Sequence, residues 1–461
     1  MDPSLSAEKL AEFQSNSLFA GKTWKWSPHA WPLLPEISEV FKSLAPAAVS
    51  FYQAIERLYL KSKGNQRILR NEELLVPWVA EYYDAGKPDW LINHAQARAV
   101  RDLLPTVLRP DLLPTAGGIA LTEWDAVPGG IGLTAQLGSA YLRKDAPLMV
   151  DSFGEALAHA ASRFGGKQSN MLIVVSEESE TYRPEMEWLA VELTKLGFSI
   201  GVAEPAELEI SDKGVHKDGK KVDLVYRFWE LFDMENIPVT KKLARLVEEE
   251  KLVVTPPMKH FQEEKLSLAL FWHHRLRRFW EENLNHGEFE LLRSVIPKTW
   301  ILDPSPVPPG ATVSGPSVQG SSLGEWMDLA KASKKERSLV IKASGFHETA
   351  WGARSVVVGD DVSSEEWEDA LVSGLGSFPN PVSVLQEFHK PALLEHSIFK
   401  DNGKVESMTG RMRLSPYFFV SGNHAKWSGS LATLCPADKK IIHGMKDGAL
   451  MPCGASATEI K

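Results

Sequence analysis

The sequence is poor in cysteine and has no long apolar run. Its two cysteines, Cys435 and Cys453, are too far apart for the CxxC spacing of a metal cluster and too few for a disulfide scaffold, so we expect a reduced, cytoplasmic setting. No stretch approaches about 18 apolar residues, and residues 1–10 show no basic segment followed by an apolar one. We therefore expect neither a membrane span, nor a membrane partner, nor secretion.

An excess of positive charge is missing as well. The formal net charge is −9 over 461 residues, which argues against a non-specific nucleic-acid binder, and we expect no nucleic-acid partner. Two glycine-rich nucleotide fingerprints, GxGxxG and GxxxxGK[ST], do not occur. The sequence leaves the oligomeric state open.

Length and composition are those of a globular protein with several domains. Hydrophobic residues make up 43% and charged residues 24% of the chain, which is ordinary for such proteins. The length predicts roughly two to four domains. The 15 tryptophans lie mostly at helical spacing among apolar residues, so we expect them in cores and not as a stacking platform.

Residues 1–108 are expected to form an N-terminal helical region. The apolar spacing favours one helix that begins at Pro35 and further helices over 47–60, 74–83 and 92–104. No catalytic signature occurs in this region. We interpret it as a helical layer that packs on the next part of the chain.

The stretch from Arg109 to Gly132 combines an arginine with three carboxylates in a turn-rich, apolar setting. The turn Thr115 to Gly118 and the apolar run after it predict a β-hairpin. Two of the carboxylates, Glu123 and Asp125, are two residues apart and project from the same face of a strand, and Asp111 on the other arm would close on them. Three such oxygen ligands suit Mg²⁺. The alternative is a solvated hairpin whose carboxylates are in phase by chance.

Helices over 132–142 and 152–164 complete the second predicted region, 109–164. Residues 165–255 then change pattern: the strands 171–175, 198–203 and 222–227, with a helix over 182–196, predict a small parallel α/β domain. Ligands of such sheets bind at the carboxyl ends of the strands, so Arg227 and Glu230 are candidate substrate contacts. A surface salt bridge explains them equally well.

Residues 256–461 form the last predicted region. It begins with a helix over 260–282, in which the adjacent His273 and His274 point about 100° apart and so do not share one ion. A linker or mobile loop rich in Pro, Gly and Ser spans 304–322. The pattern then predicts a helix over 364–375 and an antiparallel set of strands over 338–342, 355–358, 382–388, 410–420 and 427–434.

A loop of small residues after the strand that ends in Lys342 carries the second candidate site. The loop, 343–354, contains Gly345 and Gly352, and its backbone N–H groups together with the lysine would neutralise phosphate oxygens. Lys265 on the preceding helix and Gln386 with Glu387 on a later strand belong to the same set. An open backbone edge at 385–388 would hydrogen-bond an adenine.

In this order the residues resemble the ATP-grasp ligases, and most closely the synthetase domain of the glutathionylspermidine synthase family. The Arg-x-Asp of that family, followed twelve residues on by a metal-binding Glu-x-Asn, is similar to Arg109-x-Asp111 and Glu123-x-Asp125. Its helical Asn-Lys resembles Glu264-Lys265. Its Val-Lys strand before a mobile loop resembles 340–342, and its Ile-Gln strand resembles 385–386. The likeness spans residues 105 to about 435.

The chain departs from the pattern of the family at several points. Asp125 replaces an asparagine, which keeps an oxygen ligand and adds a negative charge. The Gly-Arg-x-Gly of the loop is matched only by 344–345 and 352–354, and the cysteine of an N-terminal amidase is missing because the first cysteine is Cys435. Residues that recognise spermidine or glutathione cannot be traced.

The resemblance implies an α/β (α+β) fold of ATP-grasp type. The expected parts are the N-terminal helical region (1–108), a metal-binding hairpin with helices that pack on the core (109–164), a parallel pre-ATP-grasp domain (165–255) and the nucleotide-binding lobes (256–461). The implied activity is an ATP- and Mg²⁺-dependent carboxylate–amine ligase that works through an acyl phosphate. Its partners would be a small-molecule or peptide acid and an amine.

The resemblance also assigns roles to residues. Arg109 would be catalytic and stabilise charge on the transferring phosphoryl group, and the three hairpin carboxylates would hold Mg²⁺. The nucleotide contacts would be Lys265, Lys342, Gly345, Gly352, Gln386 and Glu387. Arg227, Arg411 and Arg413 would bind substrate, with a purely structural role as the alternative. A non-catalytic ATP-grasp-like protein that binds a nucleotide or a peptide is the second interpretation of the whole chain.

Overall fold

A computed structural model describes residues 5, 7–15, 17–19, 22–142, 146–400, 403–439, 441–442 and 447–455. These residues divide into two compact units. Unit 1 comprises 1–49, 93–258 and 391–461, and unit 2 comprises 50–92 and 259–390. Each unit is assembled from separate stretches of the chain. The two units therefore do not coincide with the four contiguous regions predicted from the sequence.

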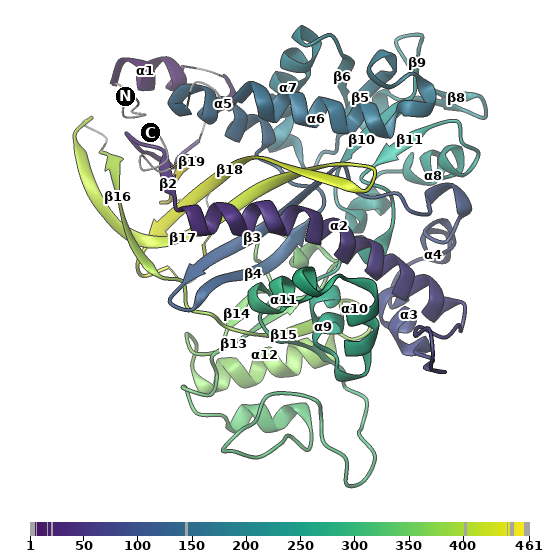
Figure 1. Ribbon diagram of the computed structural model, residues 1–461, viewed down its shortest axis with the longest axis vertical. Coiled ribbons are helices and arrows are strands. Elements are labelled where there is room, and N and C mark those ends of the chain that lie inside the picture. Colours follow the sequence, from purple (N-terminus) through teal and green to yellow (C-terminus); the bar gives the residue numbers. More distant parts are fainter. Residues whose placement is uncertain are drawn as a thin grey trace. The chain divides into compact units, whose positions relative to one another are not determined.

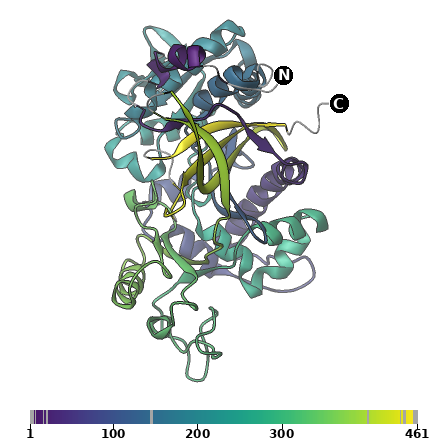
Figure 2. The ribbon, with the colours of Figure 1, turned by 90° about the vertical axis from the view of Figure 1, so that its left-hand side faces the viewer.

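Unit 1 is built on a mixed eight-stranded sheet in its described part. The order is β1-β19-β18-β17-β3-β4, with β2 on β19 and β16 on β17. The strands are β1 (Lys25–Trp26), β2 (Trp31–Leu33), β3 (Val107–Thr115), β4 (Gly118–Asp125), β16 (Leu393–Phe399), β17 (Val405–Ser421), β18 (His424–Pro436) and β19 (Ala449–Ala455). Antiparallel β17 and β18 form a long ribbon, yellow in Figure 1 and seen from the side in Figure 2.

A second sheet of unit 1 is fully parallel, in the order β11-β10-β5-β6. Its strands are β5 (Asn170–Val175), β6 (Ser199–Ala203), β10 (Leu224–Phe228) and β11 (Val253–Thr255). The predicted parallel pairing of these strands is thus confirmed, because the continuous apolar runs are buried on both faces of such a sheet. The sheet belongs to the larger unit 1. A small antiparallel sheet of β7 (Glu209–Ser211), β8 (Gly214–Lys217) and β9 (Lys220–Val222) lies in the same stretch.

Helices join the two main sheets of unit 1 into one core. Phe153 of α6 packs against Tyr226 of β10 and Phe419 of β17, with ring centroids 5.2 and 6.1 Å apart. The helices of this unit are α1 (Ala7–Gln14), α5 (Ile131–Leu142), α6 (Ala146–Ala160), α7 (Arg183–Lys195) and α8 (Thr240–Glu248). The predicted helices over 132–142 and 152–164 correspond to α5 and α6.

Unit 2 contains an antiparallel sheet in the order β12-β15-β13-β14. The strands are β12 (Thr299–Leu302), β13 (Leu339–Ala343), β14 (Val357–Val358) and β15 (Ser383–Glu387). One face of the sheet is apolar: Ile341 and Leu385 pack with Trp367 of α12 (Ser364–Gly376). We call the other face the polar face because it carries Lys342, Gln386 and Thr299, beside the apolar Val340 and Val384. The remaining helices here are α3 (Pro77–Asp84), α9 (Leu266–Trp272), α10 (Arg277–Asn283) and α11 (His286–Val295).

Several predicted helices have different limits in the structure. A single helix, α2 (Pro35–Lys63), replaces the two predicted around Pro46, and α2 and α4 (Asp89–His94) each run across a boundary between the units. A proline removes only one helical hydrogen bond, and the burial of Phe41 and Phe51 on either side offsets that loss. The helix predicted over 92–104 is reduced to the end of α4 and a short 3₁₀ turn.

The helix predicted over 260–282 is also wrong as one element. The backbone of His273 is extended, with φ −67° and ψ 122°, and this residue ends α9. A 3₁₀ turn, His274–Leu276, follows before α10 begins. The last third of the chain does not form one antiparallel set, because β13 and β15 belong to unit 2 whereas β17 and β18 belong to unit 1. Across the residues that the structure describes, no helix is both long and apolar enough to cross a membrane.

Candidate functional site

The predicted hairpin forms as β3 and β4. Arg109 lies opposite Asp125 and Asp111 lies opposite Glu123, so all four side chains emerge on one face. A bulge after Asp111 shifts the register of the pairs nearer the turn. The period of two in the sequence therefore predicted the grouping of these residues correctly.

Arginine side chains, however, engage two of the three carboxylates of this face, Asp111 and Asp125. The Arg109 guanidinium lies 3.2 Å from Asp111 Oδ1 and 2.8 Å from Asp125 Oδ2, and it donates to the Gly129 carbonyl at 3.0 Å. Arg413 of β17 lies 3.0 Å from Asp111 Oδ2. The hydroxyl of Ser415 donates to Asp111 Oδ1 at 2.9 Å. Both oxygens of Asp111 are thus engaged by the protein itself.

The charges shift the two aspartates in opposite directions. Burial disfavours the charged form of Asp111, but Arg109 and Arg413 outweigh it and lower the pKa of this carboxyl. Burial, helped by the negative charges of Asp111 and Glu123, outweighs Arg109 at Asp125 and raises its pKa. The cluster therefore holds more negative charge than its nearest cation neutralises.

A metal ion does not fit this arrangement. Among the described residues, no group of three or more His, Cys, Asp or Glu side chains is placed to hold one. Asp125 Oδ1 additionally accepts from the N–H of Val127 at 2.9 Å, so its oxygens are engaged as well. The metal ligands predicted at Asp111, Glu123 and Asp125 stay a prediction. A metal ion could bind there only if it displaced the arginine side chains from the aspartates.

Residues that the sequence did not single out complete the unit 1 face. Ser415 and Tyr417 follow Arg411 and Arg413 at a period of two on β17, and this alternation was the signal that would have identified them. The Tyr417 hydroxyl donates to the Gly129 carbonyl at 2.8 Å.

Glu185 of α7 is buried and accepts from the N–H of Gly132 at 3.0 Å, and burial raises its pKa to about 7.

Two other predicted substrate contacts are held by backbone carbonyls. Arg227 is fully buried, and its guanidinium nitrogens lie 3.0, 2.5 and 3.4 Å from the carbonyls of Pro256, Trp229 and Pro257. Arg411 donates to the carbonyls of Pro391 and Ala437. These contacts favour the structural interpretation of both arginines, whereas Arg413 joins the carboxylate cluster.

The polar face of the unit 2 sheet brings together two of the predicted nucleotide contacts. The buried Lys342 ammonium donates to the side-chain oxygen of Gln386 at 2.8 Å, and the amide nitrogen of Gln386 donates to Thr299 at 3.1 Å. Neighbouring strands place the three residues on one face, because Thr299 lies opposite Gln386 and Lys342 lies two residues beyond Val340, the partner of Gln386 on β13. Sequence reasoning missed Thr299, which begins a short strand.

The loop after β13 is tied to the segment that precedes α9. The Lys265 ammonium donates to the carbonyl of Ala350 at 3.1 Å, and the Lys265 N–H donates to the carbonyl of Ser344 at 3.0 Å. Gly352 has φ +63°, a left-handed conformation that favours glycine. Lys265 and the loop 343–354 therefore form one assembly, and the nucleotide contacts predicted at Lys265, Gly345 and Gly352 stay predictions.

One detail of the predicted nucleotide site is wrong. The backbone at 385–388 is not an open edge, because β15 lies between β12 and β13 and the N–H groups of Glu387 and Phe388 donate to Lys298 and Ser338. Glu387 follows Gln386 directly on the strand and so points to the opposite face, where it lies 3.7 Å from Lys298, and it stays a predicted nucleotide contact.

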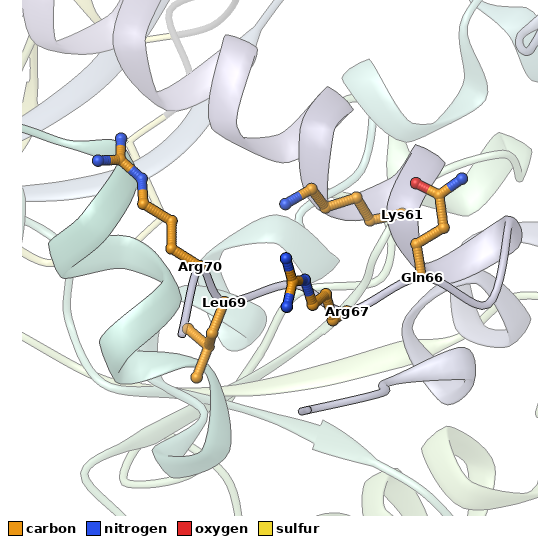
Figure 3. A pocket seen from close by; sticks show the side chains of 5 residues that line it. All are labelled: Lys61, Gln66, Arg67, Leu69 and Arg70. Carbon is orange, nitrogen blue, oxygen red and sulfur yellow. The ribbon is translucent and has the colours of Figure 1, made fainter. Parts of the chain in front are cut away.

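A hollow of about 590 Å³ on unit 2 is lined by Lys61, Gln66, Arg67, Leu69 and Arg70. Figure 3 shows that Lys61 and Arg67 extend toward the middle of the opening, whereas Arg70 points away from them. None of these residues belongs to the predicted site, and exposed basic side chains are usually solvated. We therefore place the candidate nucleotide site on the polar sheet face.

No protein-family model matches this chain, and no curated protein matches it in sequence. Among solved structures, it is similar to the glutathione synthetase-like effector GSS30 from Globodera pallida in its apo form. The TM-score is 0.54 at 12% identity, over 89% of this chain and 88% of that chain.

A γ-glutamylcysteine synthetase candidate from Methylobacillus flagellatus gives a TM-score of 0.42 at 10% identity, over 79% and 84% of the two chains, which is too low to carry an argument. The likeness to GSS30 concerns the fold alone. The chain thus has a mixed α/β fold of the glutathione synthetase-like kind, consistent with an ATP-grasp-like architecture.

Proposed function

We propose that this protein is an ATP-dependent ligase that joins a carboxylic acid to an amine. The observation that carries the proposal is the row of Lys342, Gln386 and Thr299 on the polar face of the unit 2 sheet. A lysine ammonium is a common ligand of phosphate groups, so this row is a candidate site for the phosphates of a nucleotide. The fold shared with a glutathione synthetase-like effector supports the same interpretation.

Unit 2 residues would hold the nucleotide. The donor set fits phosphates: the two lysines supply point charges, and the small residues of 344–352 allow backbone N–H groups to approach closely. ATP would supply the phosphoryl group that activates the substrate carboxylate. Lys265 and Lys342 would bind and orient it, and Gln386 would hold the ammonium of Lys342 in place.

Unit 1 residues would handle the charge of the acid. Arg109 and Arg413 present guanidinium groups that pair with planar carboxylates, as their contacts with Asp111 already illustrate. A substrate carboxylate of the same shape would compete for these donors. The catalytic role of Arg109, stabilising developing negative charge, follows from the same property.

Magnesium would enter as part of the nucleotide complex, since Mg²⁺ usually keeps waters and shares its shell with phosphates. Arginines engage Asp111 and Asp125, so no chemical step is assigned to the hairpin carboxylates.

The test is ADP release measured against a panel of peptide and small-molecule acids, with and without amines and Mg²⁺, followed by mass spectrometry of the product. An amide product whose formation requires ATP, acid and amine supports the ligase. ADP release without an amine requirement would instead indicate a small-molecule kinase.

A non-catalytic nucleotide- or peptide-binding protein is the second candidate. The engagement of both Asp111 oxygens by arginine and serine favours it, because such a cluster holds itself together without a ligand. A thermal shift with ATP that occurs without turnover over the whole panel would select this function.

A further inference from the structure

A buried ion pair in unit 2 lies outside the residues proposed to touch the nucleotide. Lys87, in the turn between α3 and α4, lies 2.6 Å from Glu264, and the side chains are only 2% and 1% exposed. The same ammonium lies 5.5 Å from the ring centroid of Phe346. A desolvated ion pair persists only where its geometry is good, and removal of one partner leaves an uncompensated charge behind. This pair is therefore no solvated surface contact.

Glu264 connects the ion pair to the start of the loop. Its other carboxylate oxygen accepts from the hydroxyl of Ser344, which is itself fully buried. The Ser344 oxygen accepts in turn from the N–H of Leu266 at 2.8 Å. Glu264 Oε1 has no hydrogen-bond partner among the described residues and is compensated by the ion pair with Lys87, whereas Oε2 and the Ser344 hydroxyl satisfy each other. A displacement of Glu264 would therefore leave Ser344 with a weaker anchor.

Close packing fixes the next residue of the loop as well. A Cβ atom on Gly345 would lie 2.5 Å from the carbonyl oxygen of Glu263 and 3.0 Å from the carboxyl carbon of Glu264. The loop backbone thus touches the segment that carries Lys265. Lys265 follows Glu264 directly, and Lys342 precedes Ser344 by two residues. The contact between Glu264 and Ser344 therefore lies next to both lysines in the chain.

We propose that Lys87 is a positioning residue for this loop: acting through Glu264, it holds Ser344 and Gly345 in place beside the two lysines. The proposal rests on the proposed function in calling the loop nucleotide-binding. Lys87 itself neither binds the nucleotide nor takes part in a chemical step. Its effect is to compensate the charge of Glu264, which otherwise would turn away from Ser344 toward water.

The experiment compares Lys87→Met with a matched control in the same unit. Lys259 and Glu56 form another buried pair, also 2.6 Å apart and 0% and 5% exposed, so Lys259→Met removes an equivalent charge. Two quantities are measured on the full chain: the Kd for ATP by calorimetry, and amide hydrogen exchange of residues 344–350 without nucleotide. Both variants should lose thermal stability, which a merely structural role also predicts.

Only Lys87→Met should raise the Kd for ATP, by about tenfold or more, because small displacements of binding groups have effects of this size. It should also accelerate exchange over 344–350. The double variant Lys87→Met/Glu264→Gln leaves no buried charge unpaired and should return both quantities to near the wild-type values. Equal effects of Lys87→Met and Lys259→Met on Kd and exchange would overturn the proposal.

Two further arms keep the outcomes distinct. If the wild-type chain binds no ATP, the proposed function fails, and the exchange data alone decide whether Lys87 anchors the loop. If Lys87→Met does not fold, Ser344→Ala replaces it, because this change cuts the contact with Glu264 and leaves the ion pair intact. Unchanged exchange over 345–350 in Ser344→Ala would then reject the anchor.

Discussion

The two polar faces of this protein treat their charges in different ways. On the unit 1 face, Asp111 is matched by Arg109 and Arg413 and is also hydrogen-bonded by Ser415. On the unit 2 face, the hydrogen bond of Lys342 runs to a neutral amide, and that amide is held by a neutral hydroxyl. The first face pairs opposite charges directly, whereas on the second the hydrogen bond of Lys342 is made to an uncharged group. We therefore expect the charges of the unit 1 face to matter most for stability and Lys342 to matter most for ligand binding.

The largest expected effect tests the unit 1 side. Asp111→Asn removes the charge that compensates two arginines in a buried cluster, so we expect the free energy of unfolding to fall by about 3–5 kcal/mol. Urea denaturation measures this change. The control is Asp212→Asn, whose side chain is 86% exposed beside Arg245 and should change stability by less than about 0.5 kcal/mol. Equal midpoints for Asp111→Asn and wild type would show that the cluster is not self-supporting.

The pH dependence of unit 1 should reveal Glu185. Burial raises its pKa to about 7 in the folded chain, well above the value of an exposed glutamate. Between the two values the folded chain keeps a proton that the unfolded chain has released, so stability falls as the pH rises from about 4.5 to about 7, by up to about 3 kcal/mol. Glu185→Gln should flatten this slope in a series of melting temperatures. A slope that is the same in the variant would assign it to other groups.

The unit 2 side is tested by Lys342→Met, which removes the charge and keeps the length of the side chain. Hydrogen bonds to charged groups contribute about 1.5–3 kcal/mol, so we expect the Kd for ATP to rise about 10- to 100-fold. Calorimetric titration measures it, with the exposed Lys335→Met as control. If Asp111→Asn weakened ATP binding and Lys342→Met did not, the ligand-binding role would have to be assigned to the unit 1 face instead of the unit 2 face.

The smallest effect concerns the residue that holds Lys342. Gln386→Leu removes a neutral partner, which is worth about 1 kcal/mol, and should raise the Kd for ATP about fivefold. Thr299→Val, one step further from the ammonium, should have a weaker effect still. A graded series from Lys342 through Gln386 to Thr299 in the same titration supports the proposed row. An effect of Thr299→Val larger than that of Gln386→Leu would contradict it.

Local patterns in the sequence predicted much of the site. The turn at Thr115 and the period of two on both arms predicted the hairpin and its shared face, because turn chemistry and side-chain alternation are local properties. The order of Lys265, Lys342 and Gln386 likewise grouped residues that lie on the unit 2 sheet or contact the loop after β13. The limits of α2 and the break at His273 escaped prediction, since packing around Phe41, Phe51 and α9 overrides local preference.

The sequence by itself determined the carboxylates and arginine of the hairpin, the parallel α/β stretch and the lysine at the end of a strand. Only the tertiary structure decided what these residues meet. Arg413 is separated from Asp111 by 302 residues and Lys87 from Glu264 by 177, so no spacing rule reveals either ion pair. Whether a carboxylate is available to a metal or held by an arginine depends on such distant partners, because burial makes the nearest opposite charge dominant.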